Sequence, residues 1–135
     1  MTLPRAVYPG STLFVTRSCT QRQFLLRPDR ETNNAFIYCL AVAAKRYRID
    51  VIDFIQMSNH LHDALYDRHG NGPAFYEHFH KLLARCVNAL RGRWENLFST
   101  EQVCVVRVET REDLIKRLVY IATNPVKDGL VAKVS

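Results

Sequence analysis

Two histidines separated by a single leucine form a pattern that could bind a metal ion. His60 and His62 lie in the stretch IQMSNHLHDAL, residues 55–65, directly after Ser58 and Asn59. In a β-strand, side chains two positions apart lie on the same face, with Cα atoms roughly 6.5–7 Å apart. Such a pair could hold one metal ion. Spacing alone leaves a second interpretation open, and favours it: two half-exposed histidines with solvent or backbone partners.

The sequence contains its own control for this spacing. His78 and His80 repeat the pattern in EHFHKLL, but within a stretch that has helical periodicity. Side chains two positions apart on a helix point about 200° away from each other, so these two histidines cannot share a ligand. The pattern therefore indicates a metal site only where the context is a strand.

A second chemical group is Tyr120, in the predicted helix REDLIKRLVYIATN, residues 111–124. At about 100° per residue, one broad apolar side is formed by Leu114, Ile115, Leu118, Val119, Ile121 and Ala122. Tyr120 falls opposite, grouped with Asp113, Lys116, Arg117 and Asn124. A tyrosine hydroxyl can act as a nucleophile on a phosphate. The alternatives are a solvent-facing aromatic at Tyr120 and an ordinary helix-terminal asparagine at Asn124.

The elements that must position these groups can be read from periodicity and turn residues. Strands are predicted at residues 11–20, 51–57, 60–66 and 103–108, and helices from Pro28, from Pro73 and over 111–123. Ser58-Asn59 suits a tight hairpin, and Thr110 with Asp113 resembles a helix cap. Asn124-Pro125 is expected to stop the last helix. The order β-α-β-β-α-β-α predicts an α+β fold, close to a split β-α-β arrangement with helices covering one face of an antiparallel sheet.

Composition adds broad constraints. The 135 residues suit one domain, and the N-terminus has no apolar signal-peptide core, so a cytoplasmic protein is expected. The four cysteines are far apart, which predicts reduced thiols rather than a disulfide framework. The formal charge is +6, and residues 1–50 hold eight Lys/Arg against three Asp/Glu. That excess favours a partner with a phosphate backbone.

Two motifs resemble those of a known family. MSNHLH resembles the HUH motif of single-tyrosine transposases, in which two histidines flank a hydrophobic residue. VYIATNPVKDGLV resembles the tyrosine-bearing helix of the REP-associated tyrosine transposases. RSCTQRQFLLRPD and RWENLF also fall where related sequences carry comparable stretches, so the resemblance covers about residues 8–131.

The resemblance implies a ferredoxin-like HUH nuclease domain that acts on single-stranded DNA, often at a hairpin. Tyr120 would attack a DNA phosphate, forming a 5′-phosphotyrosine link and releasing a 3′-hydroxyl. His60, His62 and Asn124 would be metal ligands, for Mg²⁺ or Mn²⁺, and the protein would form a homodimer. Ligand type alone, two imidazoles and an amide, favours manganese or zinc.

Candidate DNA contacts are basic side chains near these motifs: Arg17, Arg22, Arg27, Lys116, Arg117 and Lys127. Trp94 and Phe98 could stack on unpaired bases, although Trp94 is expected in the core.

The sequence also departs from the family pattern. Ser58 stands where relatives usually have proline, and Asp63 stands where they usually have an apolar residue. We expect a single domain over residues 1–135. Because the chain ends soon after Gly-Leu-Val, where relatives usually continue, a C-terminal truncation with weakened activity is a further interpretation. Two alternatives to the transposase remain: a cleavage-deficient protein that binds single-stranded or hairpin DNA, and a generic metal hydrolase with Asp63 as its base.

Overall fold

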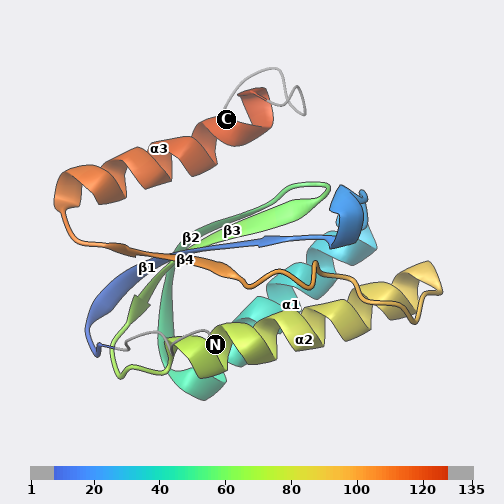
Figure 1. Ribbon diagram of the computed structural model, residues 1–135, viewed down its shortest axis with the longest axis horizontal. Coiled ribbons are helices and arrows are strands. Elements are labelled where there is room, and N and C mark those ends of the chain that lie inside the picture. Colours follow the sequence, from blue (N-terminus) through green and yellow to red (C-terminus); the bar gives the residue numbers. More distant parts are fainter. Residues whose placement is uncertain (1–7, 128–135) are drawn as a thin grey trace.

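The computed structural model describes residues 8–127, and their side chains over 8–123. Four strands and three α-helices follow one another in the predicted order β-α-β-β-α-β-α (Figure 1). The strands are β1 (Ser11–Ser18), β2 (Ile49–Gln56), β3 (His60–Asp67) and β4 (Cys104–Val108). The helices are α1 (Arg30–Tyr47), α2 (Gly72–Arg91) and α3 (Arg111–Lys127), and a short 3₁₀ turn, η1 (Thr20–Arg22), follows β1.

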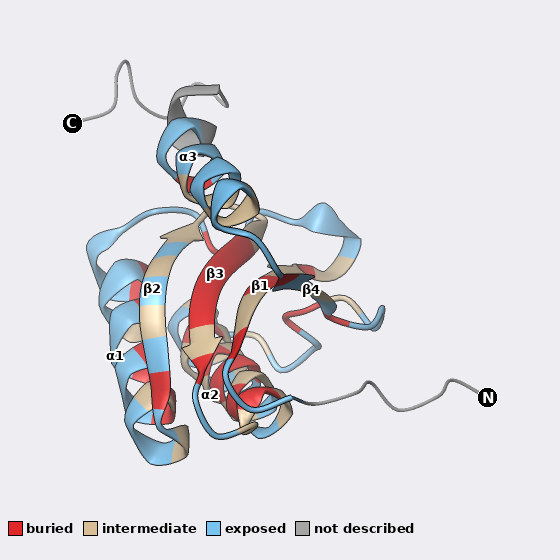
Figure 2. Ribbon diagram, turned by 90° about the vertical axis from the view of Figure 1, so that its left-hand side faces the viewer, coloured by how far each residue is buried: buried red, intermediate tan, exposed pale blue. Residues whose placement is uncertain are grey.

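The strands form one antiparallel sheet in the order β2-β3-β1-β4. This is the strand order of a ferredoxin-like, split β-α-β fold, so the predicted α+β fold class is confirmed. Helices α1 and α2 cover one face of the sheet, as expected, whereas α3 lies across the other face (Figure 1). Strand β3 is largely buried in the middle of the molecule (Figure 2). Residues on β3 therefore face either the two-helix layer or α3.

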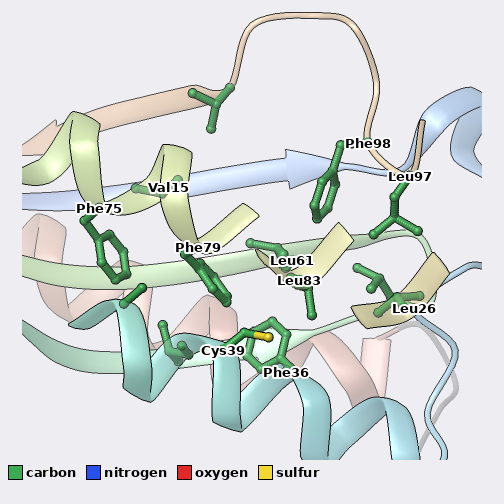
Figure 3. Packing of buried hydrophobic residues seen from close by; sticks show 14 of the residues in the cluster. Val15, Leu26, Phe36, Cys39, Leu61, Phe75, Phe79, Leu83, Leu97 and Phe98 are labelled. Atoms are coloured by element: carbon green, nitrogen blue, oxygen red, sulfur yellow. The ribbon is translucent and has the colours of Figure 1, made fainter. Parts of the chain in front are cut away.

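The main core fills the space between the sheet and helices α1 and α2. Phe36 of α1 meets Phe79 of α2 edge-on, with ring centroids 5.5 Å apart, and Phe75 stacks on Phe79. From the sheet, Val15 and Leu61 complete the cluster (Figure 3). Each fully buried side chain of this kind stabilises the fold by roughly 1.5–3 kcal/mol. This layer makes the sheet a firm platform for residues on its opposite face.

A smaller apolar cluster attaches α3 to the other face of the sheet. It consists of buried Phe14, Ala64, Val108 and Ile121.

Thr110 caps helix α3, because its hydroxyl oxygen accepts a hydrogen bond of 3.1 Å from the amide of Asp113. The predicted cap is thus confirmed. The predicted stop at Asn124-Pro125 is wrong, since α3 continues to Lys127; the restriction on a residue before proline is a bias rather than a bar.

The β2–β3 turn is held by the segment that follows β1. The amide of Met57 donates to the carbonyl oxygen of His60 at 2.8 Å, closing the predicted tight turn. The amide of Leu26 donates to the Ser58 carbonyl at 2.9 Å, and that of Cys19 donates to the Asn59 carbonyl at 2.8 Å. These bonds fix the point at which β3 begins, and with it the position of the histidine pair.

Trp94 departs from expectation. Its side chain is 93% exposed, so the prediction that it lies in the core is wrong, whereas Phe98 is buried. Trp94 lies in the connection between α2 and β4, where no helical or strand periodicity turns a side chain inward.

The prediction that the four cysteines are reduced thiols is confirmed. Cys19, Cys39, Cys86 and Cys104 are all free. Among residues 8–127, no helix combines the length and the apolar character needed to cross a lipid bilayer.

Candidate active site

The two histidines of the HLH stretch converge on one face of β3. The rings of His60 and His62 meet edge-on, with centroids 4.8 Å apart and planes at 79°. Their strand context was predicted, and β3 begins at His60 itself. The helical control behaves as expected: His78 contacts Tyr47 of α1, whereas His80 contacts Phe98. Of the two HxH pairs, both within residues 8–123, the one on the strand brings its imidazoles together.

Each histidine of the pair has a polar partner at its Nδ1 atom. Thr16 Oγ1 lies 2.9 Å from His62 Nδ1, and Asn59 Oδ1 lies 2.6 Å from His60 Nδ1. An amide oxygen only accepts hydrogen bonds, so His60 Nδ1 carries the proton and the lone pair is on Nε2. Partners of this kind fix the orientation of metal-binding histidines in proteins. With Nδ1 engaged in both rings, Nε2 is the nitrogen through which each histidine would bind a metal ion.

His62 is held neutral and close-packed. It is 5% exposed, and its ring stacks on Phe14 at 5.3 Å. Burial, and after it the neighbouring His60, lowers the pKa of His62 to about 4. Its Nε2 atom is buried without a hydrogen-bond partner among the described residues. Such an atom is costly unless something binds it, and a neutral imidazole nitrogen is a common metal ligand.

Tyr120 lies beside this pair. Its ring meets the ring of His62 edge-on, with centroids 5.4 Å apart and planes at 77°. The residue remains 41% exposed, so part of it reaches solvent. Helix α3 therefore brings together two residues that are far apart in the sequence.

The orientation of α3 differs from the predicted one. Ile115 and Val119, expected on the buried side, are 50% and 54% exposed. Arg117, expected on the polar side, instead lies over the ring of Phe14, with its guanidinium carbon 5.0 Å from the centroid. The sheet surface below α3 is partly polar around His62 and Thr16, so the helix does not present its most apolar side to it. This rotation is what brings Tyr120 next to the sheet.

The candidate DNA contacts divide between the two faces. Arg22 and Arg27 are exposed in the segment that holds the β2–β3 turn, and Lys116 is exposed on α3. Arg17 points to the side of α2, because it alternates with Thr16 along β1; its guanidinium donates to the Ser99 carbonyl at 3.1 Å. The side chains of Asn124 and Lys127 lie outside the described residues.

The donor set suits a divalent ion only in part. His60 and His62 converge, and the Nε2 atom of His62, which has no hydrogen-bond partner within the described part of the chain, fits a metal ligand. Over the described residues, no group of three or more His, Cys, Asp or Glu side chains is gathered that could hold an ion. The expected third ligand, Asn124, belongs to α3, one turn beyond Tyr120, and its side chain lies outside the described residues.

Asp63 does not belong to this site. It alternates with His62 along β3 and shares the face of Leu61, toward α1 and α2. Its side chain is fully buried, and neither carboxyl oxygen has a hydrogen-bond partner within the described part of the chain. Burial raises the pKa of Asp63 to about 8. The metal-hydrolase alternative, which needs Asp63 as a base beside the histidines, is therefore unsupported.

Thr16 and Phe14 were missed by sequence reasoning, although both contact His62. Their link to the histidine is the antiparallel register of β1 and β3, which pairs Thr16 with His62 and Phe14 with Ala64. The alternation of STLFVTRS places both residues on one face. The pairing of β1 with β3 and its register are non-local. The sequence therefore predicts that Thr16 and Phe14 share a face, but not that this face lies against His62.

Comparisons with known proteins identify the fold. No protein-family profile and no curated protein matches the sequence. Among solved structures, the chain is similar to a REP-associated tyrosine transposase bound to a REP hairpin, with a TM-score of 0.80 and 17% identity over 99% of this chain and 78% of that one. It is also similar to a candidate transposase from Deinococcus radiodurans R1, with a TM-score of 0.60 and 16% identity over 90% of this chain and 95% of that one. The chain has the α+β fold of the REP-associated tyrosine transposases.

Proposed function

We propose that this protein is a metal-dependent single-stranded DNA nickase and strand transferase, acting at hairpin DNA. The observation that carries the proposal is the contact between Tyr120 and His62 across α3 and β3. A nucleophilic side chain beside two converging imidazoles suits metal-assisted cleavage of a phosphodiester through a tyrosine. The likeness in fold to a transposase bound to a REP hairpin supports the choice of substrate.

The reaction exchanges one phosphorus–oxygen bond for another. Tyr120 Oη forms a bond to the phosphorus, while the bond from phosphorus to the 3′ oxygen of the preceding nucleotide breaks. The phenolic proton leaves to solvent, which reaches the half-exposed side chain, and the departing oxygen takes up a proton to become a 3′-hydroxyl. The product is a 5′-phosphotyrosine link. A strand transfer is the reverse attack by another 3′-hydroxyl, which regenerates free Tyr120.

The side chains around Tyr120 orient the reacting groups. His60 and His62 would hold a divalent ion through Nε2, with Asn124 as a further ligand, and Thr16 and Asn59 hold the rings in place. When bound, Mg²⁺ or Mn²⁺ supplies charge that polarises the scissile phosphate. Lys116 and Arg117 on α3, and Arg22 and Arg27 beside the turn, bind flanking phosphates.

A second candidate function is a cleavage-deficient protein that binds hairpin DNA. The basic balance of the chain, with a formal net charge of +6, supports DNA binding whether or not cleavage follows. Such a protein would bind hairpins with a strong salt dependence and would form no covalent product with any metal.

The deciding experiment incubates the protein with a hairpin oligonucleotide carrying a single-stranded flank, with Mn²⁺ or Mg²⁺. We expect a covalent adduct that retains a label placed 3′ of the nick and loses one placed 5′ of it. Tyr120→Phe should form no adduct, whereas Tyr38→Phe, at an exposed position of α1, should match the wild type. An adduct of the opposite polarity, or equal adduct from Tyr120→Phe, would contradict the proposed reaction. Hairpin binding without any adduct would favour the second candidate.

Metal binding can be tested separately by calorimetry with Mn²⁺ alone. We expect His62→Ala to weaken binding at least tenfold, with His78→Ala as the matched control on α2. Equal binding by the two variants would remove the histidine pair from the metal site. The expected homodimer stays a prediction, and sedimentation of the protein with and without hairpin DNA would test it.

A further inference from the structure

A cavity of about 460 Å³ lies on the side of the sheet away from Tyr120, between α2 and the connection that leads to β4. Helix α2 and this connection lie across the sheet from α3 (Figure 1). The lining residues that matter here are Arg17, His80, Lys81, Arg85, Trp94 and Phe98. Its volume is within the range of pockets that bind small ligands.

Trp94 gives the cavity an unusual rim. Its indole is 93% exposed, although tryptophan is normally among the more buried residue types. Proteins that hold single-stranded nucleic acids present aromatic side chains in this way, because the face of a base stacks on the ring regardless of its identity. An exposed indole at the edge of a cavity is suited to that role.

His80 supplies an unsatisfied polar group in the cavity wall. It is 4% exposed, and neither ring nitrogen has a hydrogen-bond partner among the described residues. Burial, followed by the charge of Arg17, lowers the pKa of His80 to about 3, so the ring is neutral at pH 7. A neutral imidazole offers one donor and one acceptor, which is the combination that the edge of a nucleobase can satisfy.

The charges of the lining are compatible with a phosphate nearby. Three cations, Arg17, Lys81 and Arg85, face two carboxylates, Glu77 and Glu95. Arg17 lies over the ring of Phe98, with its guanidinium carbon 5.3 Å from the centroid, and its Nε atom is buried without a hydrogen-bond partner among the described residues. The balance of charge is positive, and part of it is not neutralised within the wall.

Neighbouring residues of β1 contribute to this cavity and to the histidine site. A smaller cavity of about 90 Å³ is lined by Thr16, Arg17, Ser18, Ser99, Glu101, Gln102 and Cys104. It shares Arg17 and Ser99 with the larger one, and Thr16 is the partner of His62. Thr16 and Arg17 are neighbours whose side chains point to opposite faces of the sheet. Consecutive residues of β1 thus belong to the two sites, Thr16 to the histidine site and Arg17 to the cavity.

We propose that the cavity between α2 and the α2–β4 connection binds an unpaired base of the same single-stranded DNA that is cleaved at Tyr120. The base stacks on Trp94, its polar edge meets His80, and Lys81 and Arg85 contact the adjoining phosphates. This inference rests on the proposed function, because it takes its ligand to be the DNA substrate.

Trp94 is the single tryptophan of the chain, so intrinsic tryptophan fluorescence reports on the cavity alone. The probes are a hairpin oligonucleotide with a short thymine overhang, the same hairpin with an abasic overhang, and a blunt hairpin. We expect the thymine overhang to quench the fluorescence of the full chain, and the abasic and blunt hairpins to leave it unchanged.

A matched pair of variants tests the energy of the contact. Trp94→Ala should weaken binding of the thymine-overhang hairpin about fivefold or more, as the loss of one base-stacking contact predicts. Tyr38→Ala removes another exposed aromatic, from α1, and should leave the Kd unchanged. Thermal unfolding followed by circular dichroism confirms that both variants are folded.

The outcomes separate this inference from the proposed function. If thymine and abasic overhangs bind equally well, with no quenching and no loss on Trp94→Ala, the cavity does not hold a base. Adduct formation at Tyr120 would then stand on its own. If none of the three hairpins binds at all, the proposed function and this inference fall together.

Discussion

The ring of Tyr120 lies edge-on against the ring of His62, with centroids 5.4 Å apart. No local feature of the chain joins these residues; the packing of α3 on the sheet does. Ile121, the neighbour of Tyr120, is buried with Phe14 and Ala64, which are on the sheet beside His62. An apolar contact thus fixes the position of a group that stays partly exposed to solvent.

This anchoring can be tested at Ile121, which is 4% exposed. Ile121→Ala should lower the free energy of unfolding by about 2 kcal/mol, the lower end for truncating a buried isoleucine. Adduct formation should slow by at least tenfold, because Tyr120 is no longer held against His62. Ile115→Ala, at a half-exposed position of the same helix, serves as the control and should change neither quantity. Equal effects of both variants would show that α3 is not held through Ile121.

Thr16 is predicted to orient His62 for metal binding. Thr16→Val removes the oxygen that lies 2.9 Å from His62 Nδ1 while keeping the shape of the side chain. Loss of such a partner costs about 10- to 100-fold in metal affinity or activity. The measurement is the rate of adduct formation against Mn²⁺ concentration, with Thr12→Val on the same strand as control. Superimposable metal dependences for wild type and Thr16→Val would exclude this role.

The order of the elements, the His60/His62 pair and Tyr120 could all be predicted from the sequence, because each depends on a local pattern. The HLH spacing acquired meaning from the strand that contains it, and Tyr120 was conspicuous among the residues of its helix. The rotation of α3 could not be predicted in the same way. It depends on Thr16, His62 and Phe14 on the sheet, and their arrangement follows from a register that no local pattern encodes.

The exposure of Trp94 was mispredicted for a related reason. Large aromatic residues are usually placed in the core on average tendency, and an irregular connection offers no periodicity to correct that. Asp63 was the reverse case: its strand position already indicated a costly burial, and the structure places it without a hydrogen-bond partner among the described residues.

Asp63 is predicted to destabilise the fold. Its buried carboxyl group has no partner within the described part of the chain, and leaving a polar group in this state costs roughly 1–3 kcal/mol. Asp63→Val, which suits a buried strand position, should raise the free energy of unfolding in urea at neutral pH by about that amount. Asp63→Asn keeps an unpartnered polar group and should gain much less. A loss of stability in Asp63→Val would mean that the carboxyl group is needed where it lies.

The stability of the protein should fall with acid through His80. Burial, and secondarily Arg17, lowers the pKa of His80 to about 3 from its usual 6.5, so the unfolded chain binds a proton that the folded protein excludes. The contribution of His80 to stability is therefore fully present above pH 6.5 and is lost as the pH falls toward 3. Between pH 7 and pH 5 the loss from this group is about 2 kcal/mol.

His80→Leu isolates that contribution. Urea unfolding of the wild type and the variant at both pH values should show the wild type losing about 2 kcal/mol more. Other titrating groups, including His62, are common to both proteins and cancel in the difference. Parallel losses would indicate that His80 is protonated in the folded state or that it reaches solvent.

The most direct measurement for the central claim is the identity of the residue that carries the DNA. After reaction with hairpin DNA and a divalent metal, nuclease trimming followed by peptide mass spectrometry locates the remaining nucleotide on the chain. The account predicts a nucleotide joined through its 5′-phosphate to Tyr120, and to no other residue. A nucleotide on any other side chain would contradict the assignment of Tyr120 as the nucleophile beside His60 and His62.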